Sequence, residues 1–229
     1  MNIKLLHHTP LWVASKAIRK CWASEDKSDT EVSLWSDGEL RATCGEKDKE
    51  LIHRVGNKNK HSSTLEHLNY SFDIDGISRA CLQELARHRH ASMSVKSTRY
   101  TLKELKEAED VINNTGRINF DIVTKFCVLT TNSDVNITIA KTLNYLQRDV
   151  RSVNINDVAK YGLGEAYKTS LVWTINARSL QNFLSLRTSP SALWEIRELA
   201  YNLYETLPDE HKYLFEDYLY DNNGKTTKD

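Results

Sequence analysis

The sequence predicts an α+β fold in which helices dominate, and three patterns carry this prediction. Apolar and polar residues alternate from Leu68 to Ile74, which is typical of a half-buried strand. Residues 169–175 are β-branched and aromatic and indicate a second strand or buried segment. Apolar residues recur at helical spacing across residues 135–150. Because helical patterns outnumber strand patterns, we expect the α+β class.

The N-terminal segment is expected to begin with a short strand at residues 3–6. Thr9-Pro10 then resembles the start of a helix, with Thr9 as N-cap and Pro10 at the first helical position. Apolar residues from Ala14 to Cys21 follow with helical spacing. We therefore expect a strand followed directly by a helix.

A second short helix is expected over residues 48–55, where Gly56 ends it, followed by a polar loop at residues 57–63. After the strand that ends near Ile74, Asp75-Gly76 predicts a turn. The apolar spacing of residues 77–85 then predicts a helix that runs toward Arg89. The hydroxyl-rich residues 91–98 predict a loop.

The C-terminal half adds helices at residues 120–129 and 135–150. Asn176 can cap a helix that continues through Leu186. Ser189-Pro190 then begins another helix through Leu207, which Pro208 stops. We expect one domain over residues 1–221 and a flexible tail at 222–229.

Composition excludes several classes of protein. The 229 residues contain 31 Lys plus Arg and 31 Asp plus Glu, and this neutral balance argues against non-specific nucleic-acid binding. The four cysteines show no CxxC spacing, which favours reduced thiols. No apolar run approaches the ~18 residues of a transmembrane helix, and residues 1–8 lack a signal-peptide core. We expect a soluble cytoplasmic protein without membrane or nucleic-acid partners.

The most unusual stretch is cationic and rich in hydroxyl groups. Arg87-His88-Arg89 is followed, after seven residues, by Ser97 and then by Arg99-Tyr100. If the three cations sit at a helix C-terminus, their side chains fan over about 200° and meet different parts of a large ligand. Cations also stabilise a helix C-terminus without any ligand. The hydroxyls and Arg99 favour a phosphate site.

A second cluster lies between Trp173 and Arg187. It contains Asn176, Arg178, Asn182 and Arg187. Arg178 and Asn182 share a helix face because they are four residues apart. An ordinary N-cap role would be enough to explain Asn176, and a cation at a helix C-terminus would be enough to explain Arg187. The amide of Asn182, in contrast, can pair with the edge of a heterocycle. Together these residues favour a ligand-binding wall.

A third cluster is "HSSTLEH", from His61 to His67. Histidine and glutamate are ordinary zinc ligands, so a metallohydrolase built on His61 and His67 is one alternative. Their spacing matches neither HExxH nor one helical face, and we expect no metal here. The alternative interpretation is a capped turn that leads into the strand at Leu68.

These three clusters together resemble the flavin-dependent thymidylate synthase family. That family carries the signature RHR, seven residues, then S, which is met here by Arg87-His88-Arg89 and Ser97. "HSSTLEH" upstream and "NARSLQNFLSLR" downstream follow the family's order and spacing. The resemblance spans about residues 3–220.

The resemblance implies a compact, helix-dominated α+β domain with a small, mainly antiparallel sheet. It also implies a homotetramer with active sites at the subunit interfaces and FAD as cofactor. The implied reaction methylates dUMP to dTMP, with methylenetetrahydrofolate as carbon donor and NADPH as reductant.

The family's residue roles transfer to matching positions of this chain. The implied catalytic residues are Arg187, facing the uracil, and His61. The implied cofactor-binding residues are Ser63, Glu66, Arg87, His88, Arg89, His90, Asn176, Arg178 and Asn182. The implied substrate-binding residues are Glu84, Ser94, Val95, Lys96, Ser97, Thr98, Arg99, Lys160 and Arg187.

Three positions depart from the family pattern and concern the nucleotide contacts. Glu84 stands where members often have Gln, Val95 where several have Glu or Gln, and Lys160 where Arg is common. Lys160 keeps the charge but loses the bidentate fork. A carboxylate at position 84 is unfavourable near a phosphate unless an arginine pairs with it.

The residue types also agree with flavin chemistry. A conventional thymidylate synthase attaches a cysteine to the uracil ring, whereas no cysteine lies within the three clusters. The chain has no GxGxxG motif, so FAD must bind by another mode. A non-catalytic nucleotide- or RNA-binding module remains an alternative, against which the neutral charge and the missing RNP-like aromatic motif argue.

Overall fold

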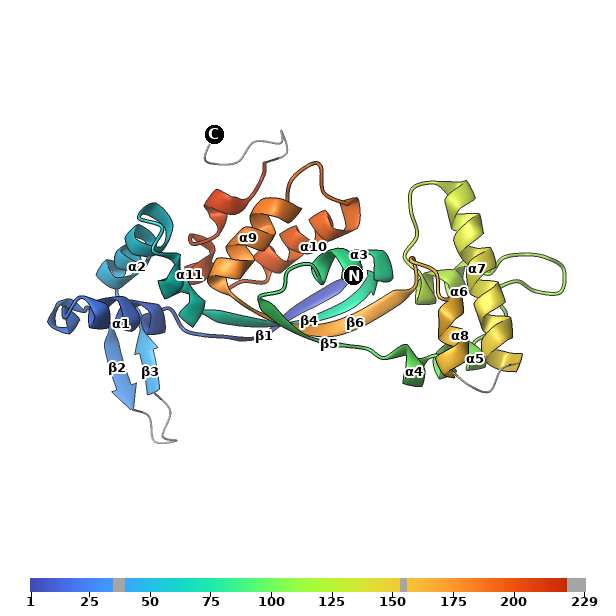
Figure 1. Ribbon diagram of the computed structural model, residues 1–229, viewed down its shortest axis with the longest axis horizontal. Coiled ribbons are helices and arrows are strands. Elements are labelled where there is room, and N and C mark those ends of the chain that lie inside the picture. Colours follow the sequence, from blue (N-terminus) through green and yellow to red (C-terminus); the bar gives the residue numbers. More distant parts are fainter. Residues whose placement is uncertain (35–39, 153–155, 222–229) are drawn as a thin grey trace. The chain divides into compact units, whose positions relative to one another are not determined.

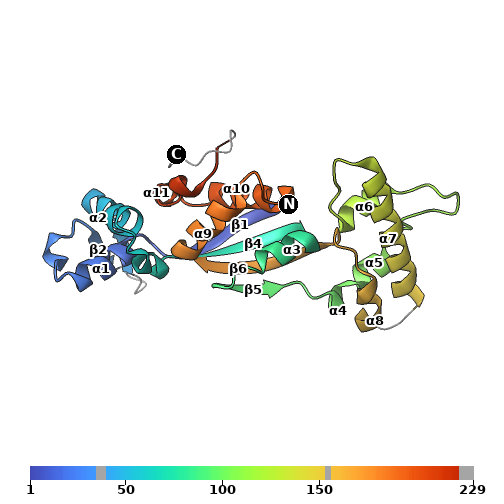
Figure 2. The ribbon, with the colours of Figure 1, turned by 45° about the horizontal axis from the view of Figure 1, so that its top comes forward.

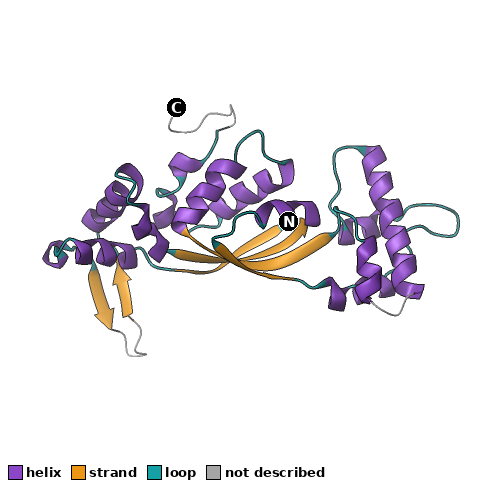
Figure 3. Cartoon of the chain, viewed as in Figure 1, coloured by secondary structure: helices purple, strands orange, loops and turns teal. Residues whose placement is uncertain are grey.

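A computed structural model of the chain describes residues 1–34, 40–152 and 156–221 (Figure 1). Figure 3 shows helices together with two small sheets, which confirms the predicted helix-dominated α+β class. The four-stranded sheet has the order β1-β4-β6-β5, and β2 pairs with β3 in the other. The predicted tail at 222–229 lies outside the described residues. One domain over residues 1–221 stays a prediction.

The four-stranded sheet contains both predicted central strands (Figure 2). Its members are β1 (Asn2–His8), β4 (Asn69–Ser78), β6 (Lys168–Asn176) and β5 (Ala91–Val95). The Thr9 N–H donates to the Asn69 carbonyl at 2.9 Å, and the Ala177 N–H donates to the Leu68 carbonyl at 2.7 Å. These bonds join the ends of neighbouring strands and place β4 antiparallel to β1 and to β6.

Two sequence predictions about the sheet are wrong. Asp75-Gly76 does not turn the chain, because β4 continues to Ser78 and Gly76 takes a positive φ of 77° inside the strand. Residues 91–98 are not simply loop, because β5 occupies Ala91–Val95. β5 is an edge strand, and polar residues are ordinary at sheet edges.

A hairpin that the sequence did not predict joins β2 (Glu31–Leu34) to β3 (Leu40–Thr43). The two strands are antiparallel, with Glu31 opposite Thr43 and Leu34 opposite Leu40. Val32 and Leu34 alternate with polar residues, but all four residues of β2 are exposed, and an alternation of only four residues is too short to predict a strand.

The chain divides into two compact units. The α7 unit comprises Met1–Asn2, Ile74–Arg87 and Ser94–Val172. The α9 unit comprises Ile3–Asp73, His88–Met93 and the chain from Trp173 onward. Strands β1, β4, β5 and β6 each contribute residues to both units.

The α7 unit is built around α7 (Ser133–Ser152), which confirms the helix predicted at residues 135–150. Its other helices are α3 (Arg79–Leu85), α4 (Thr98–Thr101), α5 (Lys103–Glu107), α6 (Phe120–Phe126) and α8 (Asn156–Ala159). Leu105, Val123 and Leu143 belong to one buried core. Gln147 is buried beside them, and its amide accepts from the Val111 N–H at 3.0 Å and donates to the Glu109 carbonyl at 2.9 Å.

The α9 unit packs aromatic side chains between its strands and helices. Its helices are α1 (Trp12–Cys21), α2 (Glu46–Ile52), α9 (Ala177–Arg187), α10 (Trp194–Glu205) and α11 (Asp209–Lys212), with a π-helical turn η2 (His53–Lys58) and a 3-10 segment η3 (Ser62–His67). Trp173 meets Phe183 edge to face at 5.1 Å between ring centroids, and Tyr70 meets Phe215 at 5.7 Å. All four rings are fully buried, so α9 is held firmly on the strands.

Several predicted helix boundaries are wrong for identifiable reasons. Thr9 does not cap α1, which begins at Trp12; its hydroxyl instead accepts from the Asn69 N–H at 3.1 Å. Gly56 does not end α2, because the chain continues through η2 to Lys58. The helix predicted from Pro190 begins only at Trp194. In contrast, Asn176 caps α9 as predicted, accepting from the Ser179 N–H at 2.9 Å.

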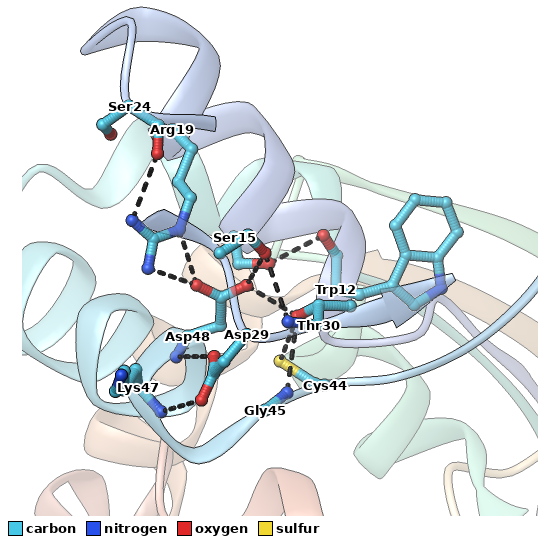
Figure 4. Close-up of polar contacts among 11 residues, drawn as sticks. Trp12, Ser15, Arg19, Ser24, Asp29, Thr30, Cys44, Gly45, Lys47 and Asp48 are labelled. Carbon is cyan, nitrogen blue, oxygen red and sulfur yellow. Dashed lines mark hydrogen bonds and ion pairs between the residues drawn. The ribbon is translucent and has the colours of Figure 1, made fainter. Parts of the chain in front are cut away.

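A buried ion pair joins α1 to α2 in the α9 unit (Figure 4). The Arg19 guanidinium contacts Asp48 through Nε at 2.6 Å and Nη2 at 2.5 Å. The hydroxyls of Ser28 and Thr30 both donate to the other Asp48 oxygen at 2.6 Å. Desolvation by burial would raise the pKa of Asp48, but the bonds from Ser28, Thr30 and Arg19 outweigh it and lower that pKa.

The four cysteines are free thiols. Cys81 and Cys127 are buried, and burial raises the pKa of Cys127 to about 12. Cys21, the last residue of α1, is exposed, whereas Cys44 is buried, with its Sγ 3.9 Å from the Thr30 hydroxyl oxygen.

Across the described residues, no helix combines the length and the apolar character needed to cross a membrane.

Candidate active site

The cationic segment leaves the end of α3 rather than continuing it. α3 stops at Leu85, and Arg87, His88 and Arg89 follow outside the helix. The predicted helical fan of these three side chains is therefore wrong. Arg87 and Arg89 are exposed, as is His90, whereas His88 is half-buried.

An arginine does lie beside the unusual Glu84. The Arg87 guanidinium is 3.6 Å from the Glu84 carboxylate, and the two residues are three positions apart. The Arg87 side chain is 72% exposed, so this pair contributes less than about 1 kcal/mol. Arg87 can therefore exchange this partner for a ligand anion at small cost.

The RHR segment and the C-terminal motif meet within the α9 unit. Arg187 Nε donates to His88 Nε2 at 2.9 Å across 99 residues of sequence. The His88 ring also packs edge to face on Phe183, with 4.9 Å between centroids. Because His88 Nε2 accepts, this nitrogen carries no proton, and the arrangement orients the Arg187 guanidinium at the end of α9.

The upstream motif meets the C-terminal motif at a second point of the α9 unit. Arg178 Nη1 lies 2.7 Å from the Glu66 carboxylate, joining α9 to η3. Both side chains are about half exposed. Asn182 is exposed one turn further along α9, whereas Asn176 is occupied as the N-cap.

His61 and Ser63 are exposed at the start of η3. The His61 carbonyl accepts from the Thr64 hydroxyl at 2.9 Å. This bond belongs to a turn, as in the alternative interpretation of this motif. Among the described residues, neither His61 nor His67 belongs to a cluster with metal-ligand geometry.

Two predicted substrate residues converge on one carboxylate in the α7 unit. Arg99 Nε is 2.7 Å from Asp157, and Lys160 Nζ is 3.9 Å from the same oxygen. Asn156 Nδ2 also donates to the Arg99 carbonyl at 2.7 Å. Asp157 was not identified from the sequence. Its position three residues before Lys160 could have indicated an ion pair between the two.

The remaining predicted substrate residues follow β5 and its exit. Ser94 and Val95 are exposed at the end of β5, and Ser97 occupies the N-cap position of α4. Lys96 and Thr98 line a cavity of about 150 Å³ together with Glu104, Lys168 and Ser170. Lys96 Nζ is 3.1 Å from Glu104, a second carboxylate that the sequence analysis missed.

A comparison with protein families shows to which family this chain belongs. The profile of the family described as "Thymidylate synthase complementing protein" matches residues 4–211. The chain belongs to the flavin-dependent thymidylate synthase family. The resemblance inferred from the three sequence clusters is thereby confirmed.

Relatives extend over nearly the whole chain. A flavin-dependent thymidylate synthase of Campylobacter jejuni is 57% identical over 218 residues, covering 94% of this chain and 96% of the relative. One from Wolinella succinogenes is 54% identical over 215 residues, covering 94% and 97%. These relatives are named as enzymes, and the alternative of a non-catalytic binding module has no support among them.

A solved flavin-dependent thymidylate synthase shares the fold. The crystal structure of Thymidylate Synthase X from Helicobacter pylori with FAD and dUMP is 51% identical and superposes with a TM-score of 0.84. The match covers 96% of this chain and 99% of the other. The predicted family fold is thus confirmed.

Proposed function

We propose that this chain methylates dUMP to dTMP, with FAD as cofactor, methylenetetrahydrofolate as carbon donor and NADPH as reductant. Membership of the family supports the reaction class. The hydrogen bond between Arg187 Nε and His88 Nε2 carries the assignment of the site, because it brings together residues from two motifs that are far apart in sequence.

The donor set on the α9 unit fits a flavin nucleotide. Arg178 offers a half-exposed cation, Asn182 an exposed amide and His88 a half-buried ring. The Arg178–Glu66 pair is solvent-exposed and contributes about 1 kcal/mol or less, so a phosphate can take the place of Glu66. FAD, when bound, supplies the redox chemistry, while the chain supplies binding and orientation.

Arg99 and Lys160 are the proposed ligands of the dUMP phosphate. Both cations lie beside Asp157, so they are already close to one anionic group. A phosphate dianion attracts them more strongly than a carboxylate does and would displace or share Asp157. Lys160 acts as a point charge, and Arg99 offers the planar fork.

Arg187 is the proposed electrophilic residue. Negative charge develops on the uracil as C5 is activated, and a fixed guanidinium beside the base stabilises that charge. His88 fixes the orientation of Arg187 by accepting from Nε. His88 therefore acts as a positioning residue in this proposal.

The proposal includes a homotetramer with shared active sites that works in the cytoplasm. α7 carries the exposed apolar side chains Val135, Ile137 and Tyr145, which a partner subunit would cover. Four free cysteines are compatible with a reducing compartment.

Flavin binding by the purified protein tests this proposal. We expect a yellow protein with the absorption spectrum of bound FAD, and Arg87→Ala and Arg178→Ala should each weaken FAD affinity by roughly 10-fold or more. Arg197→Ala is the matched control, because Arg197 on α10 donates to the Pro190 carbonyl and lies outside the three clusters. A colourless protein that also fails to take up added FAD would contradict the proposal.

A further inference from the structure

Two histidines and a glutamate that the proposed reaction does not use converge in the α9 unit. They are His8 at the end of β1 and the adjacent Glu210 and His211 in α11. One donor atom from each lies within 4.8 Å of the other two. His211 Nε2 is 3.8 Å from a Glu210 oxygen, and the two imidazole rings meet edge to face at 5.0 Å.

The buried nitrogen of His211 is the feature that requires an explanation. His211 is 0% exposed, and its Nε2 has no hydrogen-bond partner among the described residues. A buried polar atom without a partner costs about 1–3 kcal/mol, and such atoms are rare in native proteins. Nε2 lies on the side of the ring where Glu210 is found, so it points into the cluster.

The other nitrogen of His211 is held as it is in metal-binding histidines. Nδ1 lies 2.7 Å from the hydroxyl of Tyr70, which is itself fully buried. When Nδ1–H donates to Tyr70, the lone pair resides on Nε2. Metal-ligating histidines use one nitrogen for the ion and donate the other to a fixed acceptor, which sets the ring orientation.

We infer that His8, Glu210 and His211 form a binding site for a divalent transition-metal ion, with Zn²⁺ as the preferred occupant. Two imidazole nitrogens and one carboxylate oxygen suit Zn²⁺, whereas Mg²⁺ prefers oxygen ligands throughout. This site is separate from the residues proposed for FAD and dUMP, and does not depend on that assignment.

The present geometry needs only small adjustments to hold the ion. Two donors about 2.1 Å from a tetrahedral ion stand roughly 3.4 Å apart, and Nε2 is 3.8 Å from Glu210. Glu210 is exposed and His8 is half-buried, so both can rotate toward the rigid His211. Three protein ligands leave the fourth position to water. Lys49, which interacts electrostatically with Glu210, is paired with Glu46 at 2.7 Å, and this pair offsets its charge.

The site would tie the N-terminal strand to the C-terminal part of the chain. β1 ends at His8, and α11 follows more than 200 residues later in the sequence. Metal binding to the folded state would therefore raise the thermal unfolding midpoint of the protein. We expect this structural effect rather than a role in the proposed reaction.

Titration of Zn²⁺ into full-length protein treated with a chelator tests the inference. We expect one saturable site per chain, a higher unfolding midpoint with Zn²⁺ and no comparable effect of Mg²⁺. His8→Gln and Glu210→Gln should each weaken Zn²⁺ affinity by about 10-fold or more. Both side chains reach solvent, so these variants avoid disturbing the buried core.

His7→Gln is the matched control, since His7 is the exposed neighbour of His8 on β1 and lies outside the cluster. Tyr70→Phe removes the partner of Nδ1 and should weaken Zn²⁺ affinity while leaving the three ligands in place. Binding of Co²⁺ should give the intense visible absorption of a four-coordinate ion. No stoichiometric binding, or equal binding by wild type, His8→Gln and Glu210→Gln, would overturn the inference.

Discussion

Arg187 and His88 are 99 residues apart in the chain, yet they share a hydrogen bond of 2.9 Å. Both residues have ordinary structural explanations when they are read singly, as a helix C-terminal cation and as part of a basic run. Their contact is what turns two local patterns into one candidate site. The role of this pair in catalysis can be measured by changing the guanidinium alone.

We predict that Arg187→Lys lowers kcat by about 100-fold or more and changes the apparent affinity for dUMP only a few-fold. Lysine keeps the charge but loses Nε–H and the planar fork, so the charge that develops on the uracil is no longer met in the right orientation. Steady-state kinetics with Arg197→Lys as control would measure this. Equal losses in kcat and in dUMP affinity would mean that Arg187 only binds the substrate.

Asp48 provides a residue-scale test of stability. Asp48→Asn leaves Arg19 buried with a neutral partner, and we expect a loss of about 3 kcal/mol in the free energy of unfolding at pH 7. The pKa of Asp48 is lowered in the folded state, so the carboxylate stabilises the fold above the unfolded pKa of about 3.9. This contribution is lost as the pH falls from about 4 through the lower folded pKa.

Chemical denaturation of wild type and Asp48→Asn between pH 7 and pH 3 would measure the effect. The difference between the two proteins should be largest near pH 7 and should shrink below about pH 4. Asp26→Asn, an exposed aspartate in the same unit, is the control and should change little. A difference that stays constant down to pH 3 would contradict the proposed role of the charged pair.

The start of α2 illustrates how an element depends on one close approach. Asp29 accepts from the N–H groups of Lys47 and Asp48 at 2.9 and 3.1 Å, so it caps this helix from a distant part of the chain. Gly45 precedes the helix with a φ of −70°, which any residue can adopt. A Cβ at Gly45 would lie 2.2 Å from Asp29 Cγ. Glycine is therefore required because there is no room for a side chain, and not because of the backbone conformation.

We predict that Gly45→Ala lowers the free energy of unfolding by about 2 kcal/mol, because the methyl group displaces the capping carboxylate. Gly162→Ala is the matched control, since the nearest atom to its Cβ would be an ordinary contact at 3.5 Å. The cost of Gly45→Ala should shrink but not disappear in an Asp29→Ala background, because the backbone carbonyl oxygen of Asp29 would still lie 2.5 Å from the added Cβ. An unchanged unfolding midpoint in Gly45→Ala would show that Asp29 moves aside freely.

Elements with strong periodicity were predictable from sequence. β4, β6, α7 and α9 were expected because their apolar residues are buried in a regular pattern. β5 was not predictable in this way, because main-chain bonds to the neighbouring strand hold its polar residues extended. At its end, the Lys96 N–H donates to the Ser170 carbonyl at 2.8 Å. The end of α3 at Leu85 was also missed, which changed the geometry of the RHR segment.

At the scale of the whole molecule, the three clusters were identifiable from the sequence, but the contacts that their residues make in the folded chain were not. Glu66, Arg178, His88 and Arg187 were all named from motifs, and the structure brings them together in two pairs. Asp157 and Glu104 were missed because their contacts with Arg99 and Lys96 form only after folding. The His8–Glu210–His211 cluster was invisible for the same reason, since its members lie at opposite ends of the sequence.

Oligomeric state provides a prediction at the scale of the whole molecule. We expect light scattering to give about four times the 26.4 kDa chain mass. Val135→Asp should lower this mass if the exposed apolar residues of α7 contact a partner, whereas Lys141→Asp, which changes an exposed polar position on the same helix, should not. A monomer that turns over at the full rate would contradict shared active sites.

The central claim is that this chain makes dTMP by flavin chemistry, and product formation tests it most directly. FAD-loaded protein should be incubated with dUMP, methylenetetrahydrofolate and NADPH, while NADPH oxidation and dTMP are measured together. We predict dTMP in step with the NADPH oxidised, and no dTMP when dUMP or the folate is omitted. NADPH oxidation by the FAD-loaded protein without formation of dTMP would contradict the claim, as would dTMP formation by protein that lacks FAD.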